Sequence, residues 1–194
     1  MQKAALILEG GAQRGIFTSG VLDYLMEQEY YIPHVIGVSA GSCNAVDYVS
    51  RQPGRTKACM IRSGEDGKII NFHNFFQTKS LLDMDLIFER DPKELHPFDF
   101  DTYFASDMTC EIVVTNCESG QAEYYSEKED GDRLMQLCRA SSSMPLVTPM
   151  VEIDGVPYLD GGIADSIPLI HSMRSGYRKN VLIQIGRASC RERV

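Results

Sequence analysis

Ser39 is the residue whose position in the sequence points most directly to chemistry, because it lies at the centre of the pentapeptide G-V-S-A-G. The apolar residues 34–38 before it predict a buried strand, and residues 41–46 after it predict a helix. A serine on such a turn exposes its hydroxyl above the sheet edge, and Gly37 and Gly41 allow strand and helix to approach closely. We interpret Ser39 as a candidate nucleophile. The alternative is an ordinary glycine-rich turn, because this short motif often occurs by chance.

A second glycine-rich loop follows an apolar run at 3–9 that predicts another strand. The loop consists of Gly10, Gly11, Ala12, Gln13, Arg14 and Gly15. Apolar residues at helical spacing follow it: Ile16, Val21, Leu22, Leu25 and Met26. The backbone N–H groups of a loop between strand and helix bind anions, which suits either a nucleotide phosphate or the oxyanion of a tetrahedral intermediate.

The sequence favours the oxyanion hole over the nucleotide site. A dinucleotide fingerprint requires glycine where Ala12 stands and an acid after the second strand, where Ser39 stands. A P-loop requires Gly-Lys-Ser/Thr, which the sequence lacks. The carboxyl ends of adjacent parallel strands meet at one sheet edge, so the loop and Ser39 are expected to lie together there. A nucleotide-binding oxidoreductase is therefore disfavoured.

Asp160 is the third candidate, in the segment Y-L-D-G-G. It follows residues 151–157, which predict a hairpin with an Asp-Gly turn. Gly161 and Gly162 would let the backbone fold tightly and bring the carboxylate toward another group. Considered by itself, this aspartate is better explained as a loop residue that accepts hydrogen bonds from glycine N–H groups.

In this order, G-G-A-Q-R-G, G-V-S-A-G and D-G-G resemble the three blocks of the patatin-like phospholipase family. The segment A-S-S-S-M-P at 140–145, with Pro149, Gly155 and Tyr158, resembles the stretch that leads to the catalytic aspartate of that family. The resemblance covers residues 3–184 and implies a Ser–Asp dyad. By resemblance, Ser39 is the nucleophile, Asp160 is the base, and the N–H groups around Gly10, Gly11 and Ala12 form the oxyanion hole, with Arg14 close by.

The four histidines, His34, His73, His96 and His171, are expected to be surface or packing residues. Only His171 follows Ser39 and Asp160 in the order Ser–Asp–His, on a helix predicted after Pro168. A carboxylate is a weak base, with a reference pKa near 4. The dyad therefore requires Asp160 to be partly desolvated or closely hydrogen-bonded to Ser39.

The length and composition fit one domain, and we expect this domain to be a three-layer α/β/α sandwich with a mostly parallel sheet over residues 1–184. Further strands are predicted at 109–115, 122–126 and 180–184, and a helix at 130–140. The net charge of −8 argues against nucleic acid and against electrostatic binding to anionic membranes. Peripheral membrane contact would then use apolar side chains, and no run is long enough to span a bilayer. The sequence gives no indication of oligomeric state.

Six cysteines without framework spacing, and an N-terminus that enters a strand directly, predict reduced thiols and a cytoplasmic protein. No cofactor or metal is expected, because the sequence lacks H-E-x-x-H, paired C-x-x-C and EF-hand patterns. We interpret the acidic stretch as a solvated face; it comprises Asp83, Asp85, Asp91, Asp99 and Asp101.

The neighbouring apolar stretch is expected to form helices packed on the sheet; the alternative is an acyl-pocket wall or lid. It contains Phe72, Phe75, Phe76, Leu81, Leu82, Met84, Leu86, Ile87 and Phe88. Residues 185–194 resemble the translation of a common sequencing adapter, so we expect a non-native tail on a truncated domain. The alternative is a natural disordered tail.

The function that the resemblance implies is hydrolysis of fatty-acyl esters in phospholipids, lysophospholipids or neutral lipids. Ser39 would form an acyl-enzyme that water then cleaves. The alternative is a catalytically silent lipid- or acyl-binding domain, disabled by the truncation.

Overall fold

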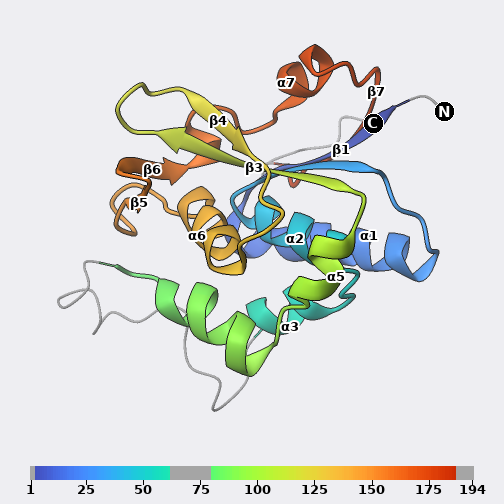
Figure 1. The fold of residues 1–194 in the computed structure, drawn as a ribbon, viewed down its shortest axis with the longest axis horizontal. Helices are drawn as coiled ribbons and strands as arrows, with labels where there is room; N and C mark the ends of the chain where they lie inside the picture. The colour runs from blue at the N-terminus through green and yellow to red at the C-terminus, as the bar shows by residue number, and fades with distance from the viewer. Residues whose placement is uncertain (1–2, 62–79, 187–194) are drawn as a thin grey trace, which may run out of the picture.

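The computed structural model describes residues 3–61 and 80–186, which form a mixed seven-stranded sheet with helices packed against it (Figure 1). The strand order is β5-β6-β3-β2-β1-β7, and β4 pairs with β3. The strands are β1 (Ala4–Leu8), β2 (His34–Val38), β3 (Thr109–Asn116), β4 (Ala122–Tyr125), β5 (Val151–Ile153), β6 (Val156–Asp160) and β7 (Lys179–Ile183).

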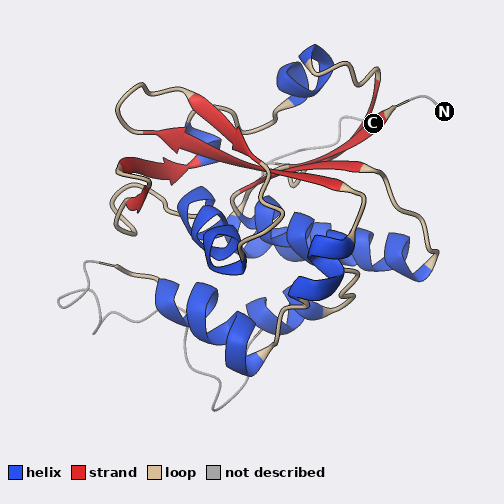
Figure 2. Cartoon of the chain, viewed as in Figure 1, coloured by secondary structure: helices blue, strands red, loops and turns tan. Residues whose placement is uncertain are grey.

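Most helices cover one face of the sheet, and α7 lies on the other (Figure 2). The α-helices are α1 (Gly15–Glu27), α2 (Ala40–Val49), α3 (Arg55–Met60), α5 (Phe100–Ala105), α6 (Gly131–Ser141) and α7 (Leu169–Arg174). The 3-10 helices are η1 (Ala12–Arg14) and η4 (Gly161–Ile163), and η3 (Leu86–Leu95) is a π-helix. The predicted α/β fold is confirmed. Its sheet combines the parallel strands β7, β1, β2 and β3 with antiparallel pairings of β3, β4, β5 and β6.

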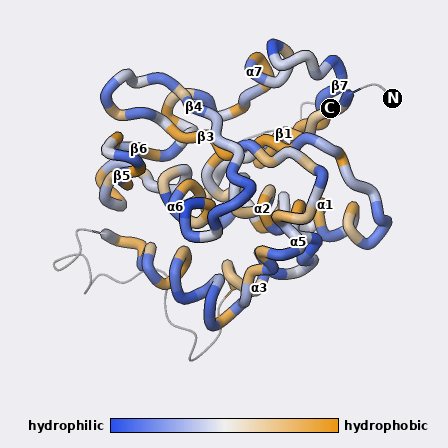
Figure 3. Tube along the Cα trace, in the orientation of Figure 1, coloured by the Kyte–Doolittle hydropathy of each residue, from blue (hydrophilic) through white to orange (hydrophobic). Residues whose placement is uncertain are grey.

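The central strands β1 and β2 are apolar and buried, as their runs of hydrophobic residues predict (Figure 3). They are parallel, and Leu8 at the end of β1 is level with Gly37 near the end of β2. The loop after β1 and the turn after β2 therefore emerge at the same edge of the sheet.

Strand β3 connects the two halves of the sheet. It runs parallel to β2, with Val113 opposite Val38, and antiparallel to β6, with Val114 opposite Asp160. Ser39 follows Val38, so this register brings the end of β6 level with the turn after β2. The pairing of β3 with both neighbours thus positions Asp160 beside Ser39.

The other elements expected from the sequence are present with shifts of one to three residues at their ends. In the β5–β6 hairpin, Asp154 and Gly155 both have positive φ angles, 53° and 79°, as the Asp-Gly turn requires. Asp130 caps α6 by accepting hydrogen bonds from the N–H groups of Asp132 and Arg133. Among the described residues, no helix is long and apolar enough to cross a bilayer.

The acidic stretch is only partly the solvated face that its sequence suggested: Asp85, Asp99 and Asp101 are exposed, and Asp91 is the exception. Asp91 is 1% exposed, so it does not belong to a solvated face. It lies in η3, a π-helix that contains Pro92, and the missing N–H of proline disturbs regular helical hydrogen bonding there. Phe72, Phe75, Phe76 and His73, and the tail from residue 187, lie outside the described residues.

Gly41 couples the first turn of α2 to β1, since a Cβ atom there would overlap the carbonyl oxygen of Leu8. We predict that Gly41→Ala lowers the free energy of unfolding by about 2 kcal/mol or more, because strand and helix must separate. Gly20→Ala is the matched control: Gly20 is an exposed residue of α1 with no atom near its Cβ position. That change should stabilise the helix by about 0.5–1 kcal/mol.

Denaturant unfolding of both variants measures this difference. Equal stabilities of the two alanine variants would contradict the close packing of α2 on β1.

Candidate active site

Ser39 occupies a strained turn between β2 and α2. Its φ and ψ angles are 55° and −126°, a conformation that L-residues rarely adopt. A Cβ atom on Gly37 would overlap the backbone of Gly41 and Ser42, so only glycine permits the strand and the helix to come this close. The local geometry is that of a nucleophile elbow, in which a tight strand–turn–helix connection presents the serine at the sheet edge.

Two serine hydroxyl groups hold the backbone of this turn. The Ser141 hydroxyl accepts a hydrogen bond from the N–H of Ser39 (2.8 Å) and donates one to the carbonyl oxygen of Val113 (2.6 Å). The Ser42 hydroxyl donates to the carbonyl oxygen of Ser39 (2.6 Å). Sequence reasoning placed Ser141 in the stretch that resembles the family but assigned it no role. The polar run S-S-S at the end of a predicted helix was the available signal.

Asp160 ends β6 with its carboxylate directed at the Ser39 turn. It is 7% exposed, it accepts a hydrogen bond from the N–H of Gly162 (2.7 Å), and its carboxylate lies close enough to the Ser39 side chain for the two groups to interact. Its backbone is also fixed, because its N–H donates to the carbonyl oxygen of Ser143 and its carbonyl oxygen accepts from the Thr115 hydroxyl, both at 2.8 Å. The structure thus brings together the two residues expected to form the dyad.

The protonation of Asp160 reflects its burial. Removal from water disfavours the charged carboxylate and raises the pKa of Asp160 above its ordinary value. The nearby Ser39 side chain and the hydrogen bond from Gly162 favour the charged form and oppose this rise without cancelling it. A carboxylate with a raised pKa is a stronger base than one in water, which is what proton abstraction from a hydroxyl requires.

The glycine loop after β1 lies directly against the Ser39 turn. A Cβ atom on Gly10 would come within 2.8 Å of the Ser39 Cβ and 2.9 Å of the Val38 carbonyl oxygen. Among the described residues, the structure records no hydrogen-bond acceptor for the N–H groups of Gly10 and Gly11. These two groups are therefore available to an oxyanion beside Ser39. Ala12, in the left-handed region with φ of 49°, begins η1.

The remaining predicted loop residues differ in position. Arg14 lines the space in front of Ser39, and its guanidinium donates to the carbonyl oxygen of Gly186 (2.9 Å). Gln13 lines the larger cavity described below. Gly15 is the first residue of α1, where its Cβ position lies 3.0 Å from the Ala40 Cβ. Its role is packing of α1 on α2, so the expectation that Gly15 belongs to the oxyanion loop is not supported.

The glycines expected to support the elbow and the dyad loop occupy tight positions. Gly37 and Gly41 have backbone against their Cβ positions, as described above. A Cβ atom on Gly161 would overlap the carbonyl oxygen of Val113 in β3. A Cβ atom on Gly162 would lie 3.0 Å from the Asp160 carboxylate oxygen that accepts the hydrogen bond of the Gly162 N–H.

Two cavities meet at Ser39. The larger has a volume of about 500 Å³, the smaller about 350 Å³, and the residues that line both are Gly11, Ala12, Arg14, Ser39 and Met144. Asp160, Gly10 and Gly162 line only the smaller one. The larger cavity is mostly apolar and is lined by Cys43, Val46, Leu82, Met84, Ile87, Phe88 and Met135, among others, and also by the polar residues Asp47, Arg55, Thr56 and Asp91.

Four residues of the apolar middle stretch, Leu82, Met84, Ile87 and Phe88, therefore belong to the wall of this cavity. Met84 and Phe88 also pack in the core. Leu82 and Ile87 pack against the same core, so these residues have the packing role expected from the sequence and line the cavity as well. Whether the cavity holds an acyl chain stays a prediction.

None of the three described histidines lines either cavity. His34 and His171 lie on the other side of the sheet, with Nε2 atoms 3.3 Å and 2.5 Å from the Glu111 carboxylate. Burial opposes the charge of Glu111, but the two neighbouring histidines, of which His171 is hydrogen-bonded to the carboxylate, lower the pKa of this carboxyl below its ordinary value. His96 binds Asp91. Packing roles, as expected from the sequence, fit the positions of His34 and His171.

A family model described as "Patatin-like phospholipase" matches residues 6–172 of the chain. The chain is 30% identical over 187 residues to "Uncharacterized protein YjjU" of Escherichia coli (strain K12), covering 94% of this chain and 52% of that protein. It therefore spans about half the length of this curated relative.

Among solved structures, VipD from Legionella pneumophila is similar, with a TM-score of 0.53 and 16% sequence identity over 84% of this chain and 46% of that chain. At this level of sequence identity, the similarity shows a shared fold alone. The family match includes the glycine loop, the Ser39 turn and Asp160, and the chain belongs to the patatin-like phospholipase family.

Proposed function

We propose that this protein is a serine acyl hydrolase that cleaves fatty-acyl esters of the phospholipid or lysophospholipid type. Ser39 is the nucleophile and Asp160 the base. The observation that carries the proposal is the placement of Ser39: it lies on a strained turn, interacts with the buried carboxylate of Asp160, and opens onto a mostly apolar cavity. Membership of the patatin-like phospholipase family supports lipid ester hydrolysis as the class of reaction.

The reaction begins when Asp160 takes the hydroxyl proton of Ser39 and the Ser39 oxygen attacks the ester carbonyl carbon. The carbonyl electron pair moves to the oxygen, which faces the N–H groups of Gly10 and Gly11. The intermediate collapses, and the leaving alcohol departs with the proton held by Asp160. The product of this half-reaction is an acyl-enzyme on Ser39.

Water completes the cycle. It attacks the acyl-enzyme carbonyl while Asp160 accepts its proton, and a second oxyanion forms in the same loop. The Ser39 oxygen then leaves with that proton, and the free fatty acid is released. The same donors serve both steps, because the carbonyl carbon does not move between them.

The two cavities are suited to different parts of the substrate. The apolar lining of the larger cavity suits an acyl chain, whose transfer from water is favourable by about 0.8 kcal/mol per methylene. The smaller cavity, with Glu9, Arg14, Asp160 and Ser166 in its wall, suits the polar alcohol part and the incoming water.

The expectation of a cytoplasmic location rests on cysteine usage and stays a prediction.

Asp160→Asn separates catalysis from stability. The folded-state pKa of Asp160 lies above its unfolded value, so its ionised form costs stability at neutral pH, and this cost vanishes as the pH falls toward the unfolded value near 4. The neutral amide removes the cost. We predict that Asp160→Asn unfolds at a higher temperature than wild type at neutral pH and not at about pH 4, while hydrolysis falls by at least about 100-fold.

Thermal unfolding and fatty-acid release from a lysophospholipid measure the two effects. Ser39→Ala is the matched control: it should abolish hydrolysis without the pH-dependent gain in stability, since it leaves the buried carboxylate in place. Full activity of either variant would contradict the proposed dyad. A folded wild type that binds fatty acid without hydrolysing esters would favour the silent acyl-binding alternative.

Val46 tests the acyl cavity, because it lies two turns along α2 from Ser39 and lines the larger cavity only. We predict that Val46→Phe lowers kcat/KM for a long-chain ester by about tenfold or more, whereas an acetyl ester retains its rate. The reason is that the larger ring occupies the space of the distal methylenes. Val181→Phe is the control, since Val181 is 45% exposed on β7.

If Val46→Phe lowered kcat/KM equally for long and short esters, the acyl chain would not bind in the larger cavity. A series of p-nitrophenyl esters of increasing chain length provides the measurement.

A further inference from the structure

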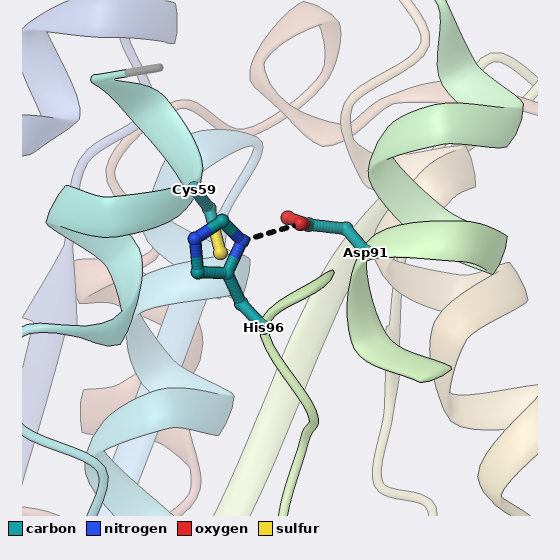
Figure 4. A group of neighbouring side chains, drawn as sticks. All are labelled: Cys59, Asp91 and His96. Carbon is teal, nitrogen blue, oxygen red and sulfur yellow. Dashed lines mark hydrogen bonds and ion pairs between the residues drawn. The ribbon is translucent and has the colours of Figure 1, made fainter. Parts of the chain in front are cut away.

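Three side chains with metal-binding atoms, Cys59, Asp91 and His96, lie close together (Figure 4). Cys59 comes from α3, Asp91 from η3, and His96 from the residue that follows η3. Their ligand atoms all lie within 4.8 Å of one another. Cys59 and Asp91 line the cavity that also reaches Ser39.

The π-helix explains why Asp91 and His96 meet. The N–H of His96 donates to the carbonyl oxygen of Asp91 at 2.8 Å, a hydrogen bond between residues five apart, as in a π-helical turn. The wider turn brings these two side chains together, and the His96 Nδ1 lies 2.6 Å from the Asp91 carboxylate. Single π-helical turns often occur at functional sites.

The cluster is preorganised by its neighbours. Asp91 is almost fully buried, and the Arg55 guanidinium fixes the backbone of His96 by donating to its carbonyl oxygen at 3.0 Å. The same Arg55 forms a 2.8 Å ion pair with Asp47, whose second carboxylate oxygen accepts the Thr56 hydroxyl. Arg55 and Asp47 therefore balance each other's charge.

We propose that Cys59, Asp91 and His96 bind a zinc ion that ties α3 to the end of η3. Thiolate, carboxylate and imidazole are the ligand types that Zn²⁺ takes in proteins, and three of them leave one position of a tetrahedron for water. The thiolate and the carboxylate together neutralise the two charges of the ion. Since Cys59 and Asp91 line the cavity, the water position opens onto it.

The site is distinct from the proposed dyad. Asp47 in α2 lies eight residues beyond Ser39, about 12 Å along the helix axis, and the cluster lies near this Asp47–Arg55 pair. Zinc binding here joins two segments of the cavity wall without contact to the reacting serine. The inference is therefore independent of whether the chain hydrolyses esters.

The test is a titration of the metal-stripped protein with ZnCl₂ by calorimetry, alongside a cobalt titration followed by absorption. We expect one zinc per chain, and with Co²⁺ the near-ultraviolet band of thiolate-to-cobalt charge transfer. Cys59→Ser should remove this band and weaken zinc binding by more than about 100-fold, beyond the roughly tenfold to 100-fold effect of losing an outer-shell partner. His96→Gln should weaken binding similarly.

Cys117→Ser is the control, because Cys117 lies at the end of the β3–β4 hairpin, outside the cluster, and its loss should leave both titrations unchanged. A wild-type protein that binds no zinc, or that gives no thiolate band with Co²⁺, would overturn the proposal. If Cys59→Ser does not fold, the His96→Gln titration decides the question, because unchanged zinc and cobalt binding in that variant would also overturn the proposal. An unchanged band in a folded Cys59→Ser would place the ion at another cysteine.

Discussion

The tight turn at Ser39 is the constraint on which the rest of the site depends. A residue held at φ of 55° and ψ of −126° costs about 1–3 kcal/mol, so its surroundings must over-determine it. Hydrogen bonds from Ser42 and to Ser141 fix its two peptide groups, and glycines at 37 and 41 remove the side chains that would force strand and helix apart. Burial of the apolar strands β1, β2 and β3 stabilises the fold and offsets the free-energy cost of this strained turn.

The second requirement is a buried carboxylate that lies level with Ser39 along the strands. Strand β3 provides it by pairing with β2 on one side and with β6 on the other, so that Asp160 is level with the residue after Val38. The same burial that raises the pKa of Asp160 disfavours its charged form in the folded protein. Basicity at the site and stability of the fold are therefore opposed at this one residue.

Local signals in the sequence predicted much of this arrangement. The strands β1 and β2, the helices after them and both glycine turns follow from short apolar runs and from glycines, which act over a few residues. The approach of Asp160 to Ser39 came from family resemblance, because the pairing of β6 with β3 joins distant segments and no local pattern sets its register. The bracing role of Ser141 went unpredicted for the same reason.

The acidic middle segment shows a different limit. Its charges suggested a solvated face, whereas the π-helix turns Asp91 inward to meet His96. Sequence periodicity assumes 3.6 residues per turn, so a π-helical stretch displaces each later side chain from the face that this period assigns to it.

The central claim is that Ser39 is a nucleophile activated by Asp160. Its most direct test is reaction of the folded protein with a fluorophosphonate, followed by intact mass and peptide mapping. Our account predicts one adduct per chain, located on the peptide that contains Ser39 and formed far more slowly in Asp160→Asn. A well-folded protein that forms no adduct, or forms it on another residue, would contradict it.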